Sequence, residues 1–495
     1  MQRYLFSIIM LVAAGTAMPL ASLQASAPAA ARKPNIVFIL ADDIGYGDFG
    51  CYGAVKVKTP NIDKLAAQGL RFTDAHSPSA VCTPSRYALM TGQYAWRNPA
   101  GDHILPGNAP LSIKPGTLTV PALLKAAGYR TAAVGKWHLG LGDTAPDWNI
   151  DIKPGPLEVG FDECFIIPAT GDRTPCVFVE NHRIHNYDPK DPITVDYKNC
   201  IPGHANPVAG IGRIGAMTGG KAALWKDEEI ADTLTARAVS FIERSKAGPF
   251  FLYLATHDIH VPRMPAARFR SSSQAGVRGD VIQEFDGCVG EVLKTLERLK
   301  LADNTLVLVT SDNGGILDYG DTVERDGDQK SNNGHAFNGL LRGTKGTPYE
   351  GGTRVPLVVR WPGKVKPGTT DELVCLVDML ATCAALTGQP LPAEAGPDSF
   401  DFLPVLLGQK RDKPVRDHLI EHSRRMGVRQ GQWKLVTTAG GSRQAKGKEA
   451  NAPPELYNLA DDIGETNDLA QKDPEKVKEL TATWQRVRNQ GRSRL

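Results

Sequence analysis

The stretch NIVFILADD, residues 35–43, places a continuous apolar run directly before two aspartates. The run does not alternate with polar residues, so it predicts a strand that is buried on both faces of a sheet. Similar short runs recur along the chain and alternate with helical patterns, which favours a mostly parallel sheet sandwiched by helices. The predicted strands are residues 35–40, 130–134, 250–255, 305–310 and 355–359, and the predicted helices are residues 61–68, 118–127, 230–245 and 281–299.

The pattern changes towards the C-terminus. Short alternating runs at residues 426–429 and 432–437 predict a hairpin, and residues 455–457 predict a third strand. Residues 474–490 predict an amphipathic terminal helix, with Asp473 as its cap and Pro474 in its first turn. We therefore expect a large α/β domain at residues 33–412 and a small antiparallel subdomain with a helix at residues 413–495.

Composition excludes several classes of protein. The chain of 495 residues contains 50 glycines and 35 prolines, which is typical of long loops over a rigid sheet. Its net charge of +3 is small and dispersed, so neither nucleic acid nor an acidic membrane surface is an expected partner. Eight cysteines are too few for a disulfide scaffold, and none has the Cys-x-x-Cys spacing of a structural zinc site.

Residues 1–27 have the pattern of a secretory signal peptide. Arg3 supplies the positive start, residues 5–14 are mostly apolar, and Ala25-Ser26-Ala27 is a small-residue cleavage site. The apolar run is shorter than the ~20 residues that a membrane-spanning helix needs. We therefore expect an exported protein, periplasmic or secreted from a bacterium, without a membrane span.

Acidic and amide side chains follow two of the predicted strands. Asp42 and Asp43 come directly after the first strand, and Asp312 and Asn313 follow the strand at residues 305–310. Either pair alone fits a turn as well as a metal site. Because the carboxyl ends of parallel strands meet at one edge of a sheet, the two pairs together favour a site for Ca²⁺ or Mg²⁺, which prefer hard oxygen ligands.

Basic and imidazole side chains follow other strands at the same edge. Lys136 and His138 come after residues 130–134, His260 comes after residues 250–255, and Lys345 lies in a glycine-rich segment. A single such residue is more often a surface residue than a catalyst. Several of them beside a metal site predict an anion-binding pocket.

The segment CTPSRYALMTG, residues 82–92, contains the pattern Cys-x-Pro-x-Arg in Cys82, Pro84 and Arg86. A lone cysteine before a helix is usually a small buried apolar residue. This pattern, however, resembles the modification signature of the sulfatases, and the strand-end segments match that family one by one over nearly the whole mature chain. The resemblance implies an alkaline-phosphatase-like fold and a sulfuric ester hydrolase.

The resemblance also implies a nucleophile and a metal site. Cys82 would be oxidised to formylglycine by a formylglycine-generating maturation enzyme, and the hydrate of this aldehyde would attack sulfur. Arg86 would hold the hydrate. The ligands of the divalent cation, usually Ca²⁺, would be Asp42, Asp43, Asp312, Asn313 and an oxygen of the converted Cys82.

Further roles follow from the same resemblance. Lys136, His138, His260 and Lys345 would surround the sulfate. His260 would act as general acid towards the leaving alcohol, and His138 would help to deprotonate the hydrate. The C-terminal phrase Glu455–Leu459, followed by Asp461, Glu465 and Leu469, resembles the terminal hairpin of the family.

The substrate is indicated by two other segments. Residues 168–175 and 179–182 resemble a loop of exported bacterial sulfatases that act on sulfated polysaccharides. Asp172 and Arg173 can bind sugar hydroxyls or a neighbouring acidic group, with His103 or His182 assisting, but they fit a salt-bridged surface turn almost as well. We therefore expect a sulfated carbohydrate, 6-O-sulfated galactose or N-acetylgalactosamine.

Three alternatives remain open from the sequence. A phosphoesterase of the same superfamily would use an unmodified nucleophile, and Pro84 and Arg86 argue against it. A non-catalytic sulfoglycan-binding protein would keep Cys82 as a thiol. A broad-specificity arylsulfatase would differ in the substrate pocket alone. Release of product separates binding from catalysis.

Overall fold

The computed structural model describes residues 32–198, 206–208, 211–316, 332–438 and 452–494. The expected signal peptide, residues 1–27, lies outside the described residues. Residues 34–495 form one compact unit. No helix within the described ranges is both long enough and apolar enough to cross a membrane.

A sheet of ten strands forms the centre of this unit, in the order β15-β2-β14-β13-β1-β12-β4-β5-β6-β7. The strands β13, β1, β12, β4 and β5 are parallel, and β14 pairs antiparallel with β13. The expected mostly parallel sheet is therefore confirmed. The bounds of its strands are β1 Asn35–Ala41, β2 Leu70–Phe72, β4 Arg130–Lys136, β5 Glu163–Ile167, β6 Val179–Glu180, β7 Arg183–Ile184, β12 Phe250–Ala255, β13 Thr305–Ser311, β14 Leu357–Arg360 and β15 Gly368–Thr370.

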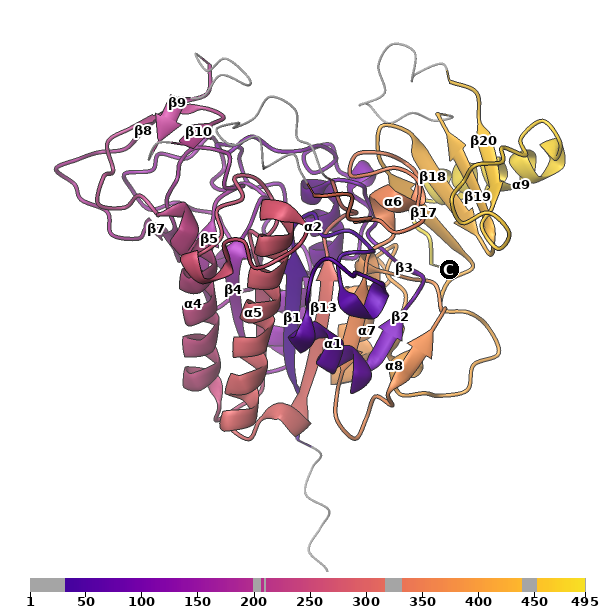
Figure 1. The fold of residues 1–495 in the computed structure, drawn as a ribbon, viewed down its shortest axis with the longest axis horizontal. Coiled ribbons are helices and arrows are strands. Elements are labelled where there is room, and N and C mark those ends of the chain that lie inside the picture. The colour runs from indigo at the N-terminus through magenta and orange to yellow at the C-terminus, as the bar shows by residue number, and fades with distance from the viewer. Residues whose placement is uncertain (1–31, 199–205, 209–210, 317–331, 439–451, 495) are drawn as a thin grey trace, which may run out of the picture. The chain divides into compact units, whose positions relative to one another are not determined.

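Helices cover both faces of the sheet. Figure 1 shows α4, α5 and α1 in front of the central strands. The side chains of β1 alternate between two apolar clusters: Ile36, Phe38 and Leu40 pack with α2, α3 and α7, and Val37 and Ile39 pack with α1, α4 and α5. The helices are α1 Pro60–Ala67, α2 Cys82–Thr91, α3 Val120–Ala126, α4 Ile230–Ser245, α5 Gly276–Arg298, α6 Glu350–Thr353, α7 Met379–Thr387 and α8 Leu403–Leu406.

A separate antiparallel sheet of four strands follows, in the order β17-β18-β19-β20. The three predicted C-terminal strands are present, and β17 adds a strand that the sequence did not predict. Leu480, Trp484 and Val487 of the terminal helix pack with the apolar side of this sheet. The elements are β17 His418–His422, β18 Met426–Gln430, β19 Trp433–Thr437, β20 Glu455–Asn458 and α9 Pro474–Asn489.

The remaining strands form pairs. Their bounds are β3 Ala75–His76 with β16 Val374–Cys375, β8 Thr194–Asp196 with β11 Ala216–Thr218, and β9 Asn206–Val208 with β10 Ile211–Arg213. The parallel strands β1, β12, β4 and β13 bring their carboxyl ends to one edge of the large sheet. The predicted chemical groups follow these ends.

Candidate active site

Three carboxylates lie together where β1 and β13 end. Asp42, Asp43 and Asp312 are fully buried, and each offers an oxygen within 4.8 Å of oxygens of the other two. Asn313 Nδ2 donates a hydrogen bond to Asp43 Oδ1 at 2.7 Å. The structure therefore brings together all the predicted protein ligands of a cation apart from the modified Cys82.

The donor set fits a divalent cation such as Ca²⁺ or Mg²⁺. Asp42 Oδ1 and Asn313 Oδ1 are buried and have no hydrogen-bond partner, which is costly unless an ion or another group satisfies them. Burial, together with the Asp312 and Asp43 carboxylates, raises the pKa of Asp42 to about 7 in spite of Lys136. A cation among these oxygens would remove this repulsion, and hard oxygen ligands are the ones such cations prefer.

A basic side chain of the protein pairs with each of the three carboxylates. Lys136 Nζ lies 2.6 Å from Asp42 Oδ2, Arg86 Nη2 lies 2.7 Å from Asp312 Oδ2, and Lys345 Nζ lies 2.7 Å from Asp43 Oδ1. The positive and negative charges of these pairs balance. A bound divalent cation would therefore give the site a net positive charge, which suits an anionic substrate.

Cys82 is the first residue of α2 and is 1% exposed. Pro84 fits the first turn, where a backbone N–H has no helical partner. Figure 1 shows α2 near the end of β1 and β13. Burial lowers the pKa of Lys345, but the Asp43 carboxylate and then Cys82 outweigh it, so the pKa of Lys345 is raised.

Two predicted histidines lie beside the same cluster. His138 Nε2 donates to the backbone oxygen of Leu105 at 2.9 Å, which leaves Nδ1 as the acceptor nitrogen. His260 Nδ1 donates to the backbone oxygen of Val261 at 2.9 Å, and its Nε2 lies 4.0 Å from Asp43 Oδ2. Burial and nearby lysines hold the pKa of both histidines well below the usual range, so both are neutral at pH 7.

Asp172 and Arg173 form a salt bridge of 3.1 Å. They do not form an exposed surface turn, because Asp172 is 4% exposed and its Oδ1 lies 3.9 Å from His260 Nδ1. The Thr170 hydroxyl contacts both side chains. Asp172 therefore lies buried beside His260 and is paired with Arg173.

His103 and His182 are placed differently. His103 is 47% exposed in its side chain and pairs with Asp102 at 3.0 Å, on the loop before Leu105. His182 pairs with Glu158 at 3.0 Å in the turn between β6 and β7, at the edge of the large sheet. The structure does not place His182 with the other predicted residues.

His257 was missing from the residues predicted for the site. Its ring lies 6.1 Å from the His260 ring and is buried. A Cβ atom on Gly171 would lie 2.4 Å from His257 Cε1, so the close approach of the Asp172 segment requires glycine there. Burial and Lys136 lower the pKa of His257 to about 3. Two residues separate His257 from His260, and this spacing was the signal in the sequence that pointed to His257.

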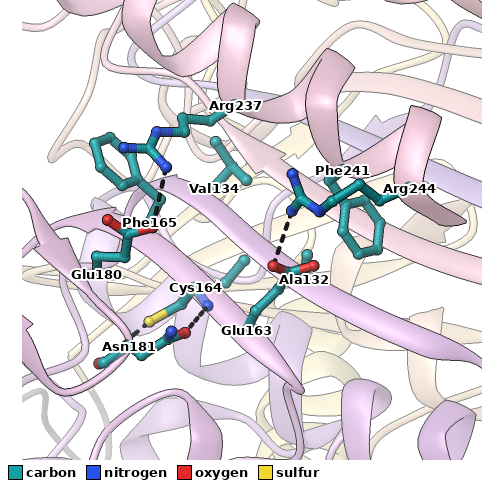
Figure 2. A pocket seen from close by; sticks show the side chains of 11 residues that line it. Ala132, Val134, Glu163, Cys164, Phe165, Glu180, Asn181, Arg237, Phe241 and Arg244 are labelled. Carbon is teal, nitrogen blue, oxygen red and sulfur yellow. Dashed lines mark hydrogen bonds and ion pairs between the residues drawn. The ribbon is translucent and has the colours of Figure 1, made fainter.

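A small pocket between β4, β5 and α4 lies apart from these residues (Figure 2). Arg237 pairs with Glu180 at 3.0 Å and Arg244 with Glu163 at 2.9 Å, so its charges are compensated. Its volume of about 40 Å³ holds water rather than a sugar. It is not the substrate site.

A protein-family model described as sulfatase matches residues 34–389. The chain belongs to the sulfatase family. This sulfatase is 45% identical over 485 residues to the N-acetylgalactosamine-6-O-sulfatase of Bacteroides thetaiotaomicron, with 92% of this chain and 93% of the relative covered. It is 36% identical over 465 residues to arylsulfatase A of Homo sapiens, with 89% and 84% covered.

Solved structures share the fold of this sulfatase. One from work on glycosaminoglycan metabolism by Bacteroides thetaiotaomicron has a TM-score of 0.86 at 45% identity and covers 92% of this chain and 100% of its own. The phosphonate monoester hydrolase of Agrobacterium radiobacter has a TM-score of 0.60 at 17% identity, over 92% and 96% of the chains, and shares the fold alone. These comparisons confirm the predicted alkaline-phosphatase-like fold. They also confirm the class of sulfuric ester hydrolase, which the sequence favoured over a phosphoesterase and a binding protein.

Proposed function

We propose that this sulfatase removes sulfate from a carbohydrate sulfate ester, and that the sulfated unit is 6-O-sulfated N-acetylgalactosamine or galactose. The observation that carries the proposal is the 45% identity to a bacterial N-acetylgalactosamine-6-O-sulfatase across 92% of the chain. A buried site with paired cations beside a carboxylate cluster supports an anionic ester as substrate.

The proposed nucleophile derives from Cys82, which a maturation enzyme of the producing cell would convert to formylglycine. The hydrated aldehyde supplies a nucleophilic oxygen for attack on sulfur. The place of Cys82 supports this role, because the start of α2 stabilises negative charge through the helix dipole. Arg86 adds positive charge from the same helix and is fixed by Asp312.

Asp42, Asp43, Asp312 and Asn313 are proposed to hold one divalent cation, Ca²⁺ or Mg²⁺, together with an oxygen of the converted Cys82. Such a cation polarises an ester oxygen and stabilises charge in the transition state. The unpartnered oxygens of Asp42 and Asn313 support this assignment.

Lys136 and Lys345 are proposed to bind the sulfate oxygens. Both ammonium groups are buried and already oriented by carboxylates, so they can stabilise the transition state with little reorganisation. His260 is proposed to take up a proton when the anionic ester binds beside it and to give that proton to the leaving alcohol, and His138 Nδ1 is proposed to accept a proton from the converted Cys82. The neutral state of His138 and its hydrogen bond to Leu105 leave Nδ1 able to accept.

Asp172 and Arg173 are proposed to bind the sugar, with His103 nearer the solvent. Asp172 and Arg173, buried beside His260, would lie next to the leaving alcohol. Residues 33–412 would thus carry every reacting group and residues 413–495 would support them. Residues 1–27 are proposed to direct export, so that the enzyme meets its glycan in the periplasm or outside the cell.

The test is sulfate release by the matured enzyme with Ca²⁺ present. The substrates are N-acetylgalactosamine-6-sulfate, galactose-6-sulfate, N-acetylgalactosamine-4-sulfate and 4-nitrophenyl sulfate. We expect kcat/KM for a 6-sulfate to exceed that for the 4-sulfate by at least ~10²-fold. A preference for the 4-sulfate would overturn the 6-O assignment, and turnover of 4-nitrophenyl sulfate alone would favour a broad-specificity arylsulfatase.

A further inference from the structure

Both ends of the loop that carries Lys345 are attached to one residue of the C-terminal part of the chain. We call residues 342–350 the Lys345 loop. At its first end, Arg342 Nη1 donates to the backbone oxygen of Glu465 at 2.8 Å. At its last end, the backbone N–H of Glu350 donates to Glu465 Oε2 at 2.8 Å. Glu465 is fully buried and follows β20, so a distant residue closes this loop.

The middle of the Lys345 loop contacts segments beside the proposed nucleophile and metal ligands. The N–H of Gly346 donates to the backbone oxygen of Ala80 at 2.8 Å. The N–H of Lys345 donates to the backbone oxygen of Gly315 at 3.1 Å. The loop is irregular before α6. Since no regular element fixes the loop, these backbone hydrogen bonds and the attachments at its two ends together decide where the Lys345 backbone lies.

A buried charge network lies behind the same loop. Glu350 accepts from Arg354 Nε at 2.6 Å and from Lys434 Nζ at 2.8 Å. Lys434, on β19, also lies 3.0 Å from Glu421 Oε2 and 3.6 Å from Glu465 Oε1. Lys434 therefore joins the two carboxylates at the last end of the loop, Glu350 and Glu465, to the C-terminal sheet.

This network includes Asp74, His76 and Glu350, whose potential ligand atoms lie within 4.8 Å of one another. It is not a second cation site, because both oxygens of Asp74 and both of Glu350 already accept from cationic side chains, whereas Asp42 Oδ1 has no hydrogen-bond partner. Arg354 Nη2 lies 2.8 Å and Arg429 Nη2 3.1 Å from Asp74. His76 lies 2.8 Å from Asp74 on one side and 2.8 Å from Glu421 on the other. The network is structural.

We propose that Glu465 is a positioning residue, which holds Lys345 in the anion pocket by fixing both ends of the Lys345 loop. This inference rests on the proposed role of Lys345 in binding sulfate. A lysine side chain has many rotamers, so a displaced Lys345 backbone would have to select a different and less favourable rotamer to return the ammonium group to the same point. A displacement of about 1 Å lowers a rate by about 10²-fold. The C-terminal part thus affects the reaction through Lys345.

The test compares Glu465→Ala, Glu465→Gln, Lys345→Ala and the double variant Glu465→Ala/Lys345→Ala in matured enzyme. The alanine variant leaves the N–H of Glu350 without its acceptor, and the glutamine variant keeps an acceptor oxygen. Glu465 has φ 51°, a left-handed conformation that strains alanine and glutamine alike. We expect kcat/KM to fall by ~10- to 100-fold in Glu465→Ala and to stay within about 3-fold in Glu465→Gln.

Coupling between the two sites separates positioning from general loss of stability. If Glu465 acts through Lys345, Glu465→Ala lowers kcat/KM by less than about 2-fold in the Lys345→Ala background. Leu480→Ala is the control, because Leu480 of α9 packs in the C-terminal apolar cluster. It should lower the unfolding midpoint and leave kcat/KM at 25 °C unchanged.

Two results would overturn the inference. One is a Glu465→Ala enzyme with wild-type kcat/KM, and the other is an equal loss with and without Lys345. Should Glu465→Ala not fold, Arg342→Met replaces it, because this half-exposed side chain makes the other attachment. If instead the wild-type enzyme releases no sulfate from any of the four esters, the proposed function itself fails. That failure is distinct from a failure of the proposed role of Glu465, which is measured in the variants.

Discussion

Lys136, Arg86 and Lys345 each pair with a different carboxylate of the acidic cluster. The pairs orient three cations around one point, and they also explain why single changes there are severe. Removing one partner leaves a buried charge unpaired, which costs about 3–5 kcal/mol of stability. Activity lost in such a variant therefore has to be compared with its unfolding midpoint.

Replacing Cys82 tests the nucleophile at this scale. We expect Cys82→Ser to lower multiple-turnover sulfate release by at least ~10³-fold, since an unmodified serine that takes up the sulfuryl group has no second hydroxyl with which to expel the sulfate. Cys51→Ser is the matched control: Cys51 lies away from the site, and burial raises the pKa of its thiol to about 12. Multiple turnovers at the wild-type rate from Cys82→Ser would contradict the assignment.

Removal of the cation tests the acidic cluster. Chelation should abolish sulfate release and lower the unfolding midpoint, and added Ca²⁺ at 100 times its Kd should restore about 2.7 kcal/mol of stability. The rise of the unfolding midpoint on addition of Ca²⁺ should vanish in Asp42→Asn. It should persist in Asp232→Asn, because the Asp232 carboxylate of the wild type pairs with Arg268 at the surface. A midpoint that chelation leaves unchanged would argue against a cation among these residues.

Many of the proposed site residues could be predicted because they follow directly after strands. Asp42, Asp312 and Lys136 lie at or next to strand ends, and the ends of buried strands can be recognised in a sequence. Sequence alone could not show that Asp172 is buried beside His260, because no periodic pattern marks a loop as part of a site. His257 was missed although its spacing from His260 is visible in the sequence.

At the scale of elements, β1 supplies the first two carboxylates and divides the apolar interior. Val37 and Ile39 face one cluster, and Ile36, Phe38 and Leu40 face the other. The site depends on this strand because both faces hold its end in place. The predicted strands and helices were recognisable because long apolar runs leave little choice of structure. The strand β17, sequence HLIEH, was missed because it has only two adjacent apolar residues.

A core substitution in β1 tests this dependence. We expect Ile39→Ala to lower the free energy of unfolding by about 2–5 kcal/mol, since Ile39 is 0% exposed and its removal leaves a cavity. Val55→Ala is the control at 85% exposure and should change it by less than ~0.5 kcal/mol. Equal effects in urea unfolding would show that β1 is not the buried centre of the sheet.

At the scale of the whole molecule, the C-terminal sheet holds the segment before Cys82 as well as the Lys345 loop. The N–H of Ala80 donates to the backbone oxygen of His422 at 2.8 Å. The N–H of His422 donates to the backbone oxygen of Pro78 at 2.9 Å. These contacts join residues more than three hundred positions apart. No local pattern predicts them, so the sequence indicated a C-terminal subdomain without indicating its contacts with the site.

His422 makes this contact sensitive to pH. Burial lowers its pKa to about 4, in spite of Asp102, while an unfolded histidine titrates near ~6.5. The unfolded state therefore binds more protons between these values, and stability falls as pH drops from ~6.5 to about 4. We expect the stability of the wild type relative to His422→Gln to fall by roughly 3 kcal/mol across this range. A difference that is constant with pH would contradict this.

The most direct measurement is mass spectrometry of the tryptic peptide 72–86 from protein isolated from its native cell. It reports the chemical state of Cys82 in the whole, folded enzyme. The account predicts that the aldehyde of formylglycine replaces the thiol in enzyme that releases sulfate. An intact thiol in every active molecule would contradict the proposed nucleophile.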